Sequence, residues 1–124
     1  MGNYNWTREF KERLKIYAIA IIKLYRKIPK SGEGRVIGKQ MLRSGTSVAA
    51  NYRSACRGRS RKEFIAKLGI VIEEADETLF WLELVRDSNI YHGKEIDFLI
   101  RETDEILAII SKTRYSTQYP NKKK

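Results

Sequence analysis

The sequence predicts an all-α fold, an antiparallel up-down-up-down four-helix bundle formed by one domain. Four long segments of the 124-residue chain place apolar residues at alternating spacings of three and four, which is typical of amphipathic helices, and no strand pattern interrupts them. The connections between these segments are short, so consecutive helices are expected to run in opposite directions. A hydrophobic content of 42% is enough for a single core.

The first helix is expected to start near Asn5 or Thr7 and to end before Pro29. Proline restricts the residue that precedes it and cannot continue the hydrogen-bond ladder. The composition of residues 30–34 indicates a loop. The core-facing positions of this helix are Phe10, Leu14, Tyr17, Ile21, Leu24 and Ile28.

The second helix is expected from about Arg35 to Cys56. Its middle is dominated by small residues, and Gly45 costs about 1 kcal/mol of helix propensity relative to alanine. This cost suggests that a neighbouring helix backbone packs very close to Gly45. Along one face the sequence places Ile37, Met41, Ser44, Val48, Tyr52 and Ala55.

The third helix is expected from Arg61 to about Asp87, after a sharp basic corner. Ser60 and Glu63 form a capping box, in which the serine hydroxyl accepts from the amide of residue 63 and the glutamate reaches back to the amide of residue 60. Gly58 is expected to adopt the left-handed conformation that closes the preceding helix.

The fourth helix carries its core-facing pattern from Ile96 to Thr113. Residues 114–124 have no periodicity and end in three lysines. The sequence therefore predicts a bundle domain at residues 1–113 and a basic, flexible C-terminal tail at residues 114–124.

An ordered set of short motifs occupies the middle of the chain: Arg43-Ser44, Thr46-Ser47-Val48, Ala50-Asn51, Arg59-Ser60, Lys62-Glu63-Phe64, Glu74-Ala75-Asp76-Glu77-Thr78 and Trp81-Leu82-Glu83. At this spacing the set resembles the four-helix-bundle family first described from intervening sequences in bacterial 23S rRNA genes. The resemblance runs from about Phe10 to about Lys112. The family is known mainly as a fold, so the resemblance implies the architecture more than the function.

Helices one and three are apolar over more surface than one bundle seam requires, which predicts a homo-oligomer. The resemblance implies a homopentameric ring, since relatives of known structure form five-membered rings. A similar fold serves as the accessory variability determinant of diversity-generating retroelements, where a basic pentamer partners a reverse transcriptase and its RNA. A reverse transcriptase is therefore a partner implied by analogy alone.

The sequence lacks the residues that a metal site or a nucleophilic active site needs. The chain has one histidine, His92, in an expected loop, and one cysteine, Cys56, which is expected to be packed and inert. A ferritin-like site needs two Glu-x-x-His motifs, and a zinc site needs more Cys and His ligands. We therefore expect no metal, no cofactor and no enzymatic activity.

The carboxylates of helix three are interpreted as a solvated or interface-facing surface. Glu77 is expected to play a structural part by satisfying polar groups of helix two, such as Ser47 or Asn51. The cluster comprises Glu73, Glu74, Asp76, Glu77 and Glu83.

A single cysteine is typical of a reducing compartment, and the first residues do not resemble a secretory signal. The longest uncharged run, residues 44–52, is far shorter than a membrane-spanning helix. The sequence thus predicts a cytoplasmic protein without a membrane partner.

The charge pattern favours nucleic acid as the partner, and we interpret that nucleic acid as RNA. The formal charge is +10, with eight basic and two acidic residues in 1–30, eight and one in 31–62, and two and seven in 63–88. Phosphate contacts need no reader motif. Tyr52, Tyr115 and Tyr119 could add base stacking. The candidate phosphate contacts are Arg35, Lys39, Arg43, Arg53, Arg57, Arg59, Arg61 and Lys62.

The alternative is an oligomeric protein–protein scaffold, or an accessory subunit of a partner enzyme such as a reverse transcriptase, with no direct nucleic-acid role. Its charges would then serve assembly and docking. Binding to an anionic membrane is a weaker third hypothesis, because no helix clearly pairs a Lys/Arg-rich face with an exposed Trp/Phe face.

Overall fold

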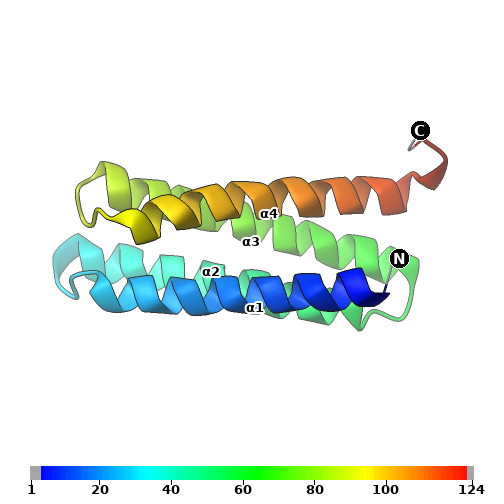
Figure 1. Ribbon diagram of the computed structural model, residues 1–124, viewed down its shortest axis with the longest axis horizontal. Helices are drawn as coiled ribbons and strands as arrows, with labels where there is room; N and C mark the ends of the chain where they lie inside the picture. The colour runs from blue at the N-terminus through cyan, green and yellow to red at the C-terminus, as the bar shows by residue number, and fades with distance from the viewer. Residues whose placement is uncertain (1–3, 123–124) are drawn as a thin grey trace.

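The structure, a computed structural model, describes residues 4–122, and these contain four long α-helices and no strand. The all-α, four-helix prediction is confirmed. Consecutive helices run antiparallel along one long axis (Figure 1). The elements are α1 (Tyr4–Lys27), α2 (Gly32–Cys56), α3 (Arg61–Asp87), α4 (Lys94–Gln118) and a 3₁₀ turn at Pro120–Lys122.

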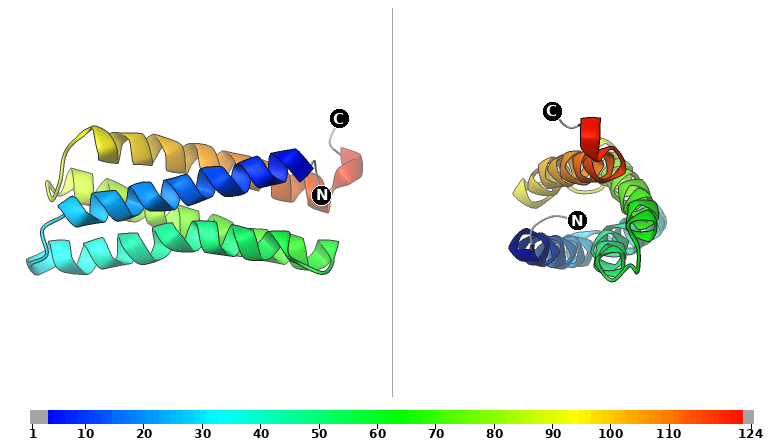
Figure 2. Two further views of the ribbon diagram at one scale, coloured as in Figure 1. Left: turned by 60° about the horizontal axis from the view of Figure 1, so that its bottom comes forward. Right: turned by 90° about the vertical axis from the view of Figure 1, so that its right-hand side faces the viewer.

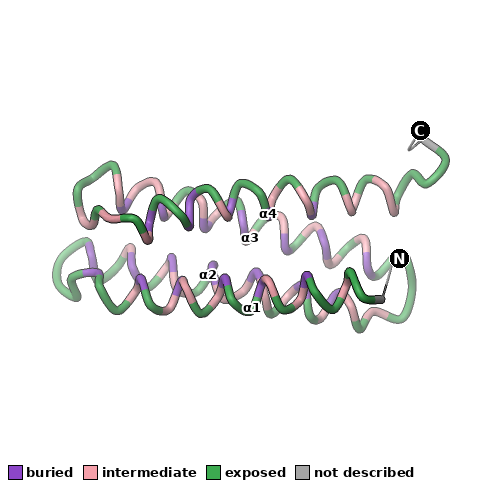
Figure 3. The backbone as a smooth tube through the Cα atoms, viewed as in Figure 1, coloured by how far each residue is buried: buried purple, intermediate pink, exposed green. Residues whose placement is uncertain are grey.

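The core lies along the inward stripe of each helix, where buried positions recur at the predicted spacing (Figure 3). All six core-facing positions predicted for α1 are buried. Three buried polar residues, Ser44, Thr78 and Thr103, are hydrogen-bonded: Thr78 donates to Ser44 Oγ at 2.9 Å, and Thr103 Oγ1 lies 2.6 Å from the Tyr17 hydroxyl. These bonds offset the cost of burying hydroxyl groups and tie α2 to α3 and α1 to α4.

The contact between α1 and α4 is the least extensive of the contacts between neighbouring helices. Viewed down the bundle axis, α1 and α4 flank one side and α3 lies on the opposite side (Figure 2). The seam is bridged by Tyr17 and by Arg13, which donates two bonds of 2.8 and 2.9 Å to the Glu102 carboxylate and one to Glu105.

Two helix boundaries differ from the prediction. The helix α2 begins at Gly32 rather than near Arg35. Gly32 has a φ of +57°, which favours glycine, and a Cβ at Gly34 would lie 2.5 Å from the Pro29 carbonyl oxygen. The helix α4 continues to Gln118, so residues 114–118, predicted as flexible tail, are helical. Arg61 donates to the Thr117 carbonyl at 2.9 Å and so links this last turn of α4 to the start of α3.

Glycine stands at positions 45 and 58 for reasons other than those predicted. Gly45 does meet a very close neighbour, but the neighbour is the side chain of Ile21 rather than a backbone. Gly58 is not left-handed: the glycines with positive φ in residues 4–122 are Gly32 and Gly93. At Gly58 a Cβ would lie 3.1 Å from the Ala55 carbonyl oxygen, so the tight corner itself requires glycine.

The cap of α3 is confirmed at the serine and corrected at the glutamate. Ser60 Oγ accepts from the Glu63 amide at 3.0 Å. The Glu63 carboxylate reaches one residue further back than predicted and accepts from the Arg59 amide at 2.6 Å. Both bonds hold the α2–α3 corner in one geometry.

Candidate nucleic-acid interface

The antiparallel order brings the first turns of α1 and α3 and the last turns of α2 and α4 to one end of the bundle (Figure 1). We call this half, which contains the α2–α3 corner, the basic end. Four of the predicted residues lie in or next to the corner: Arg57, Arg59, Arg61 and Lys62.

A groove between α1 and α2 is the main feature of the basic end. It has a volume of about 470 Å³, and we call it the α1–α2 groove. Small residues from α2 form its floor, and five cations face one carboxylate around it. The lining residues are Arg8, Lys11, Glu12, Lys15, Thr46, Ala49, Ala50, Arg53 and Arg57.

Three of the five cations, Arg8, Lys11 and Lys15, come from α1 and are absent from the predicted set. Their spacing of three and four places them on one face of the helix. The excess of basic residues in 1–30 was a signal for them. Their alignment with Arg53 and Arg57 required knowing which flank of α1 packs beside α2.

The structure does not bring Arg35 and Lys39 to this groove. Both side chains are exposed, on the half of α2 away from the corner. Arg35 and Arg53 are 18 residues apart, which is about five turns and about 27 Å along the axis. They therefore share a face of α2 but not a binding site.

Arg43 is engaged inside the chain. Its guanidinium donates to Glu77 at 2.6 Å and to Glu74 at 3.3 Å, which links α2 to α3. Glu77 also accepts from the Trp81 indole N–H at 2.8 Å, and the Arg43 bond, followed by the Trp81 bond, lowers the pKa of the Glu77 carboxyl. Arg43 is thus a structural residue rather than an available phosphate contact.

The partners expected for Glu77 are also corrected. Asn51 does not reach the carboxylate; its side-chain N–H donates to the Ser47 carbonyl at 2.9 Å within α2. Glu77 is structural as predicted, but through Arg43 and Trp81.

Arg61 also has a partner within the chain, since it donates to the Thr117 carbonyl at 2.9 Å and to the Gln118 carbonyl at 3.4 Å. These are the last carbonyls of α4, where a cation is favoured by the helix dipole. Arg59 and Lys62 are exposed beside it. Of the eight predicted contacts, Arg53 and Arg57 line the groove, and Arg59 and Lys62 extend its charge around the corner.

The tyrosines predicted for stacking divide into two cases. Tyr52 is 1% exposed and packs edge-on against Phe10, so its proposed stacking on bases is wrong. Its place on the core face of α2 explains this. Tyr115 and Tyr119 are exposed at the basic end, with ring centroids 5.0 Å apart.

The titratable groups outside the basic residues offer no assembled site in the described part of the chain. Cys56 is half-buried, and burial raises the pKa of its thiol. His92 is exposed, with Nε2 2.7 Å from Asn89 Oδ1. No cluster of three or more His, Cys, Asp or Glu side chains with metal-binding geometry occurs within residues 4–122.

None of the helices within the described residues combines the length and apolar character needed to cross a bilayer.

The comparisons with known proteins agree on one family. A family model described as 23S rRNA-intervening sequence protein matches residues 9–112. A crystal structure of a protein of unknown function from the S23 ribosomal protein family of Bacteroides thetaiotaomicron superposes with a TM-score of 0.78 at 32% identity, covering 88% of this chain and 97% of that one. No curated protein matches the chain.

Proposed function

The chain belongs to the 23S rRNA-intervening sequence protein family, as its sequence motifs predicted, and we propose that it is a non-enzymatic, homo-oligomeric protein that binds RNA at its basic end. The observation that carries this proposal is the α1–α2 groove, where five cations surround one carboxylate.

The groove cations are available to a ligand. Among the described residues, none of Arg8, Lys11, Lys15, Arg53 and Arg57 forms an ion pair. Arg43, on the same helix, is by contrast held by two carboxylates. Unpaired cations at this spacing attract a phosphate backbone, and binding is strengthened by release of the counterions that the phosphates carry.

The groove favours shape and charge over base sequence. It is lined by the small residues Thr46, Ala49 and Ala50 and by five cations, and cations contact any phosphate whatever the base. The two exposed tyrosines near the corner provide a surface on which unpaired bases can stack. We therefore propose RNA binding with steep salt dependence and little sequence preference.

The proposed oligomer is a homopentamer. Apolar side chains on outward faces support self-association: Ile16 is 59% exposed, Phe80 54% and Phe98 49%. These side chains lie on α1, α3 and α4, so more than one face of the chain offers apolar surface that a second copy can remove from water. Light scattering on the purified protein tests the number of copies, with a mass five times the 14.5 kDa of one chain expected.

The RNA-binding test compares two double variants that remove equal charge. Arg53→Gln/Arg57→Gln removes two groove cations, and Arg35→Gln/Lys39→Gln removes two cations from the far half of α2. Binding to a fluorescently labelled single-stranded RNA is measured over a range of KCl concentrations. The groove variant should lose affinity, and its salt slope should fall by about 1.4, at about 0.7 per lost contact.

The far-end variant should keep most of its affinity. Equal losses in both variants would show that net charge alone drives binding and would refute the groove as the site. Unchanged affinity in Arg53→Gln/Arg57→Gln, extended to Arg59→Gln, would refute the proposal for the basic end.

The second candidate function is a protein scaffold or an accessory subunit of a partner enzyme such as a reverse transcriptase. It is favoured by one observation: Phe80 is 54% exposed on α3, beside the carboxylates Asp76 and Glu83, whereas the α1–α2 groove is lined by residues of α1 and α2 and by Arg57. Protein that is oligomeric and free of nucleic acid at low salt, as judged by absorbance at 260 and 280 nm, would favour this function.

A further inference from the structure

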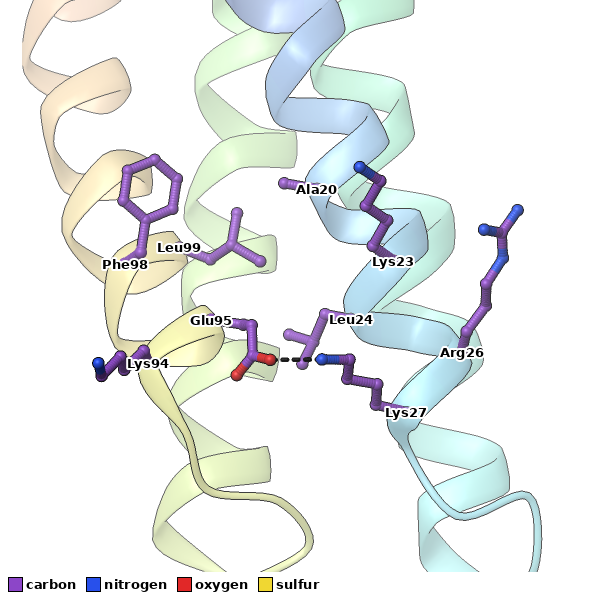
Figure 4. Close-up of a pocket in the computed structure, with 9 residues that line it drawn as sticks. All are labelled: Ala20, Lys23, Leu24, Arg26, Lys27, Lys94, Glu95, Phe98 and Leu99. Atoms are coloured by element: carbon purple, nitrogen blue, oxygen red, sulfur yellow. Dashed lines mark hydrogen bonds and ion pairs between the residues drawn. The ribbon is translucent and has the colours of Figure 1, made fainter.

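The seam between α1 and α4 opens into a hollow of about 540 Å³ at the end of the bundle opposite the basic end (Figure 4). We call it the α1–α4 groove. The ion pair between Lys27 Nζ and Glu95 Oε2, at 2.5 Å, spans the seam beside it. The lining residues are Ala20, Lys23, Leu24, Arg26, Lys27, Lys94, Glu95, Phe98 and Leu99.

The interior of the α1–α4 groove is apolar and its rim is cationic. Leu24 and Leu99 face each other across the hollow, and Phe98 stands at its edge with 49% of its surface exposed (Figure 4). Lys23 and Arg26 extend outward from the α1 side. Since the carboxylate of Glu95 is taken up by Lys27, the remaining rim charge is positive.

The outward face of α3 has the opposite character. An exposed aromatic ring, Phe80, lies among carboxylates spaced by three and four residues, which places them on one stripe of the helix. We call this stripe the α3 acidic face; it comprises Glu73, Asp76, Phe80 and Glu83, whereas Asp87, four residues further on, is already paired with Arg86 at 2.8 Å. The Phe80 ring packs edge-on against Trp81 with centroids 5.0 Å apart, so it projects from a supported position.

We propose that the α3 acidic face of one copy docks into the α1–α4 groove of a second copy, with the Phe80 ring in the hollow. This inference rests on the self-association proposed above and assigns its surfaces. The Phe80 ring would enter the hollow beside the exposed ring of Phe98, and the carboxylates near Phe80 would meet the cationic rim.

The alternative acceptor, the α1–α2 groove, carries positive charge but suits the ring poorly. Its floor has no large apolar side chain, whereas the α1–α4 groove supplies two leucines and Phe98. An exposed aromatic anchor gains most where a preformed apolar hollow removes it from water.

Helix α3 and the seam between α1 and α4 lie on opposite sides of the bundle (Figure 2). Each copy can therefore donate Phe80 to one neighbour while receiving Phe80 from another. Such an interface is heterologous, and successive copies close into a ring when the rotation between them permits. The acceptor lies at the end away from the α1–α2 groove, which leaves the proposed RNA surface accessible.

The test uses one variant that disables the donor and one that disables the acceptor. Phe80→Glu places a charge where the ring would be buried, and Phe98→Glu/Arg26→Glu makes the groove rim acidic. Each variant alone should be monomeric by light scattering. Tyr115→Glu, at an aromatic residue 53% exposed on the same helix as Phe98, is the matched control and should assemble as the wild type does.

Mixing the two variants gives the decisive measurement. The intact acidic face of the groove variant can still enter the intact groove of Phe80→Glu, so a 1:1 mixture should form a dimer of about 29 kDa, twice the chain mass of 14.5 kDa, and nothing larger. Circular dichroism checks that every variant is folded. Asp76→Lys replaces Phe80→Glu should the latter lose helicity.

The outcomes separate this inference from the proposed function. A monomeric wild-type protein would overturn both the docking and the oligomer, and the ligand of the α1–α4 groove would then be a different apolar anion. An oligomer that survives both variants would overturn the docking alone. A mixture that stays monomeric would overturn the heterologous arrangement. RNA binding is measured independently, on Arg53→Gln/Arg57→Gln and Arg35→Gln/Lys39→Gln.

Discussion

Gly45→Ala tests the close packing of α2 on α1. A Cβ at Gly45 would lie 2.9 Å from both Cγ1 and Cγ2 of Ile21, which is fully buried in the core. Overpacking of this kind costs about 1–3 kcal/mol, because the side chain that is struck has nowhere to move. Alanine returns about 0.8–1.0 kcal/mol of helix propensity relative to glycine. The net change expected is a loss of about 0–2 kcal/mol of unfolding free energy.

Gly69→Ala is the matched control, since it makes the same chemical change in the middle of α3. There a Cβ would meet the flexible Arg114 side chain at 3.4–3.6 Å, which is ordinary contact. This variant should be stabilised by up to about 1 kcal/mol. Urea unfolding followed by circular dichroism, at one chain concentration because assembly adds stability, should therefore separate the two variants by about 1–3 kcal/mol.

The contact between position 45 and Ile21 is isolated by repeating Gly45→Ala in a protein that carries Ile21→Ala. Ile21→Ala alone should cost about 2–5 kcal/mol by creating a cavity. In that background the added methyl group of Gly45→Ala enters free space, so its effect should become neutral or stabilising. If Gly45→Ala stabilises the wild-type protein as much as Gly69→Ala does, the close packing of α1 on α2 inferred here is refuted.

Three further predictions concern the ion pair, the helix cap and the thiol. The bond from Lys27 lowers the pKa of Glu95 to about 2. The ion pair therefore stabilises the fold above the ordinary glutamate pKa of about 4.3, and this stabilisation is lost as the pH falls from about 4.3 to about 2. NMR titration of Lys27→Met should show the pKa of Glu95 returning toward about 4.3. Ser60→Ala removes the acceptor for the Glu63 amide and should cost about 1 kcal/mol in urea unfolding, while Ser60→Asp should retain most of the stability. Because burial raises the pKa of Cys56, its thiol should react with a disulfide reagent at pH 7 more slowly in the folded than in the urea-unfolded chain, and equal rates would contradict its packing.

The sequence alone determined the helices, their inward faces and the family. Periodic positions such as Leu14, Ile21 and Met41 are buried as predicted, because the angular position of a residue on a helix follows from its number alone. Local chemistry likewise placed Pro29 after α1 and Ser60 at the cap of α3. One local rule failed: the glycines predicted a loop at residues 30–34, yet Gly32 and Gly34 lie in α2. Gly32 has a φ of +57°, which favours glycine, and a Cβ at Gly34 would lie 2.5 Å from the Pro29 carbonyl oxygen.

The tertiary structure decided which charged residues are available. Arg43 and Arg53 are the same residue type on one helix, but Arg43 faces the flank where α3 supplies two carboxylates and Arg53 faces the flank where α1 supplies three more cations. Helical periodicity gives a residue's direction from its own axis, and it does not say which neighbouring helix lies in that direction. Only the packing of the bundle joins Arg8 to Arg53, about 45 residues apart in the chain, and only packing leaves Phe80 exposed opposite an open α1–α4 seam.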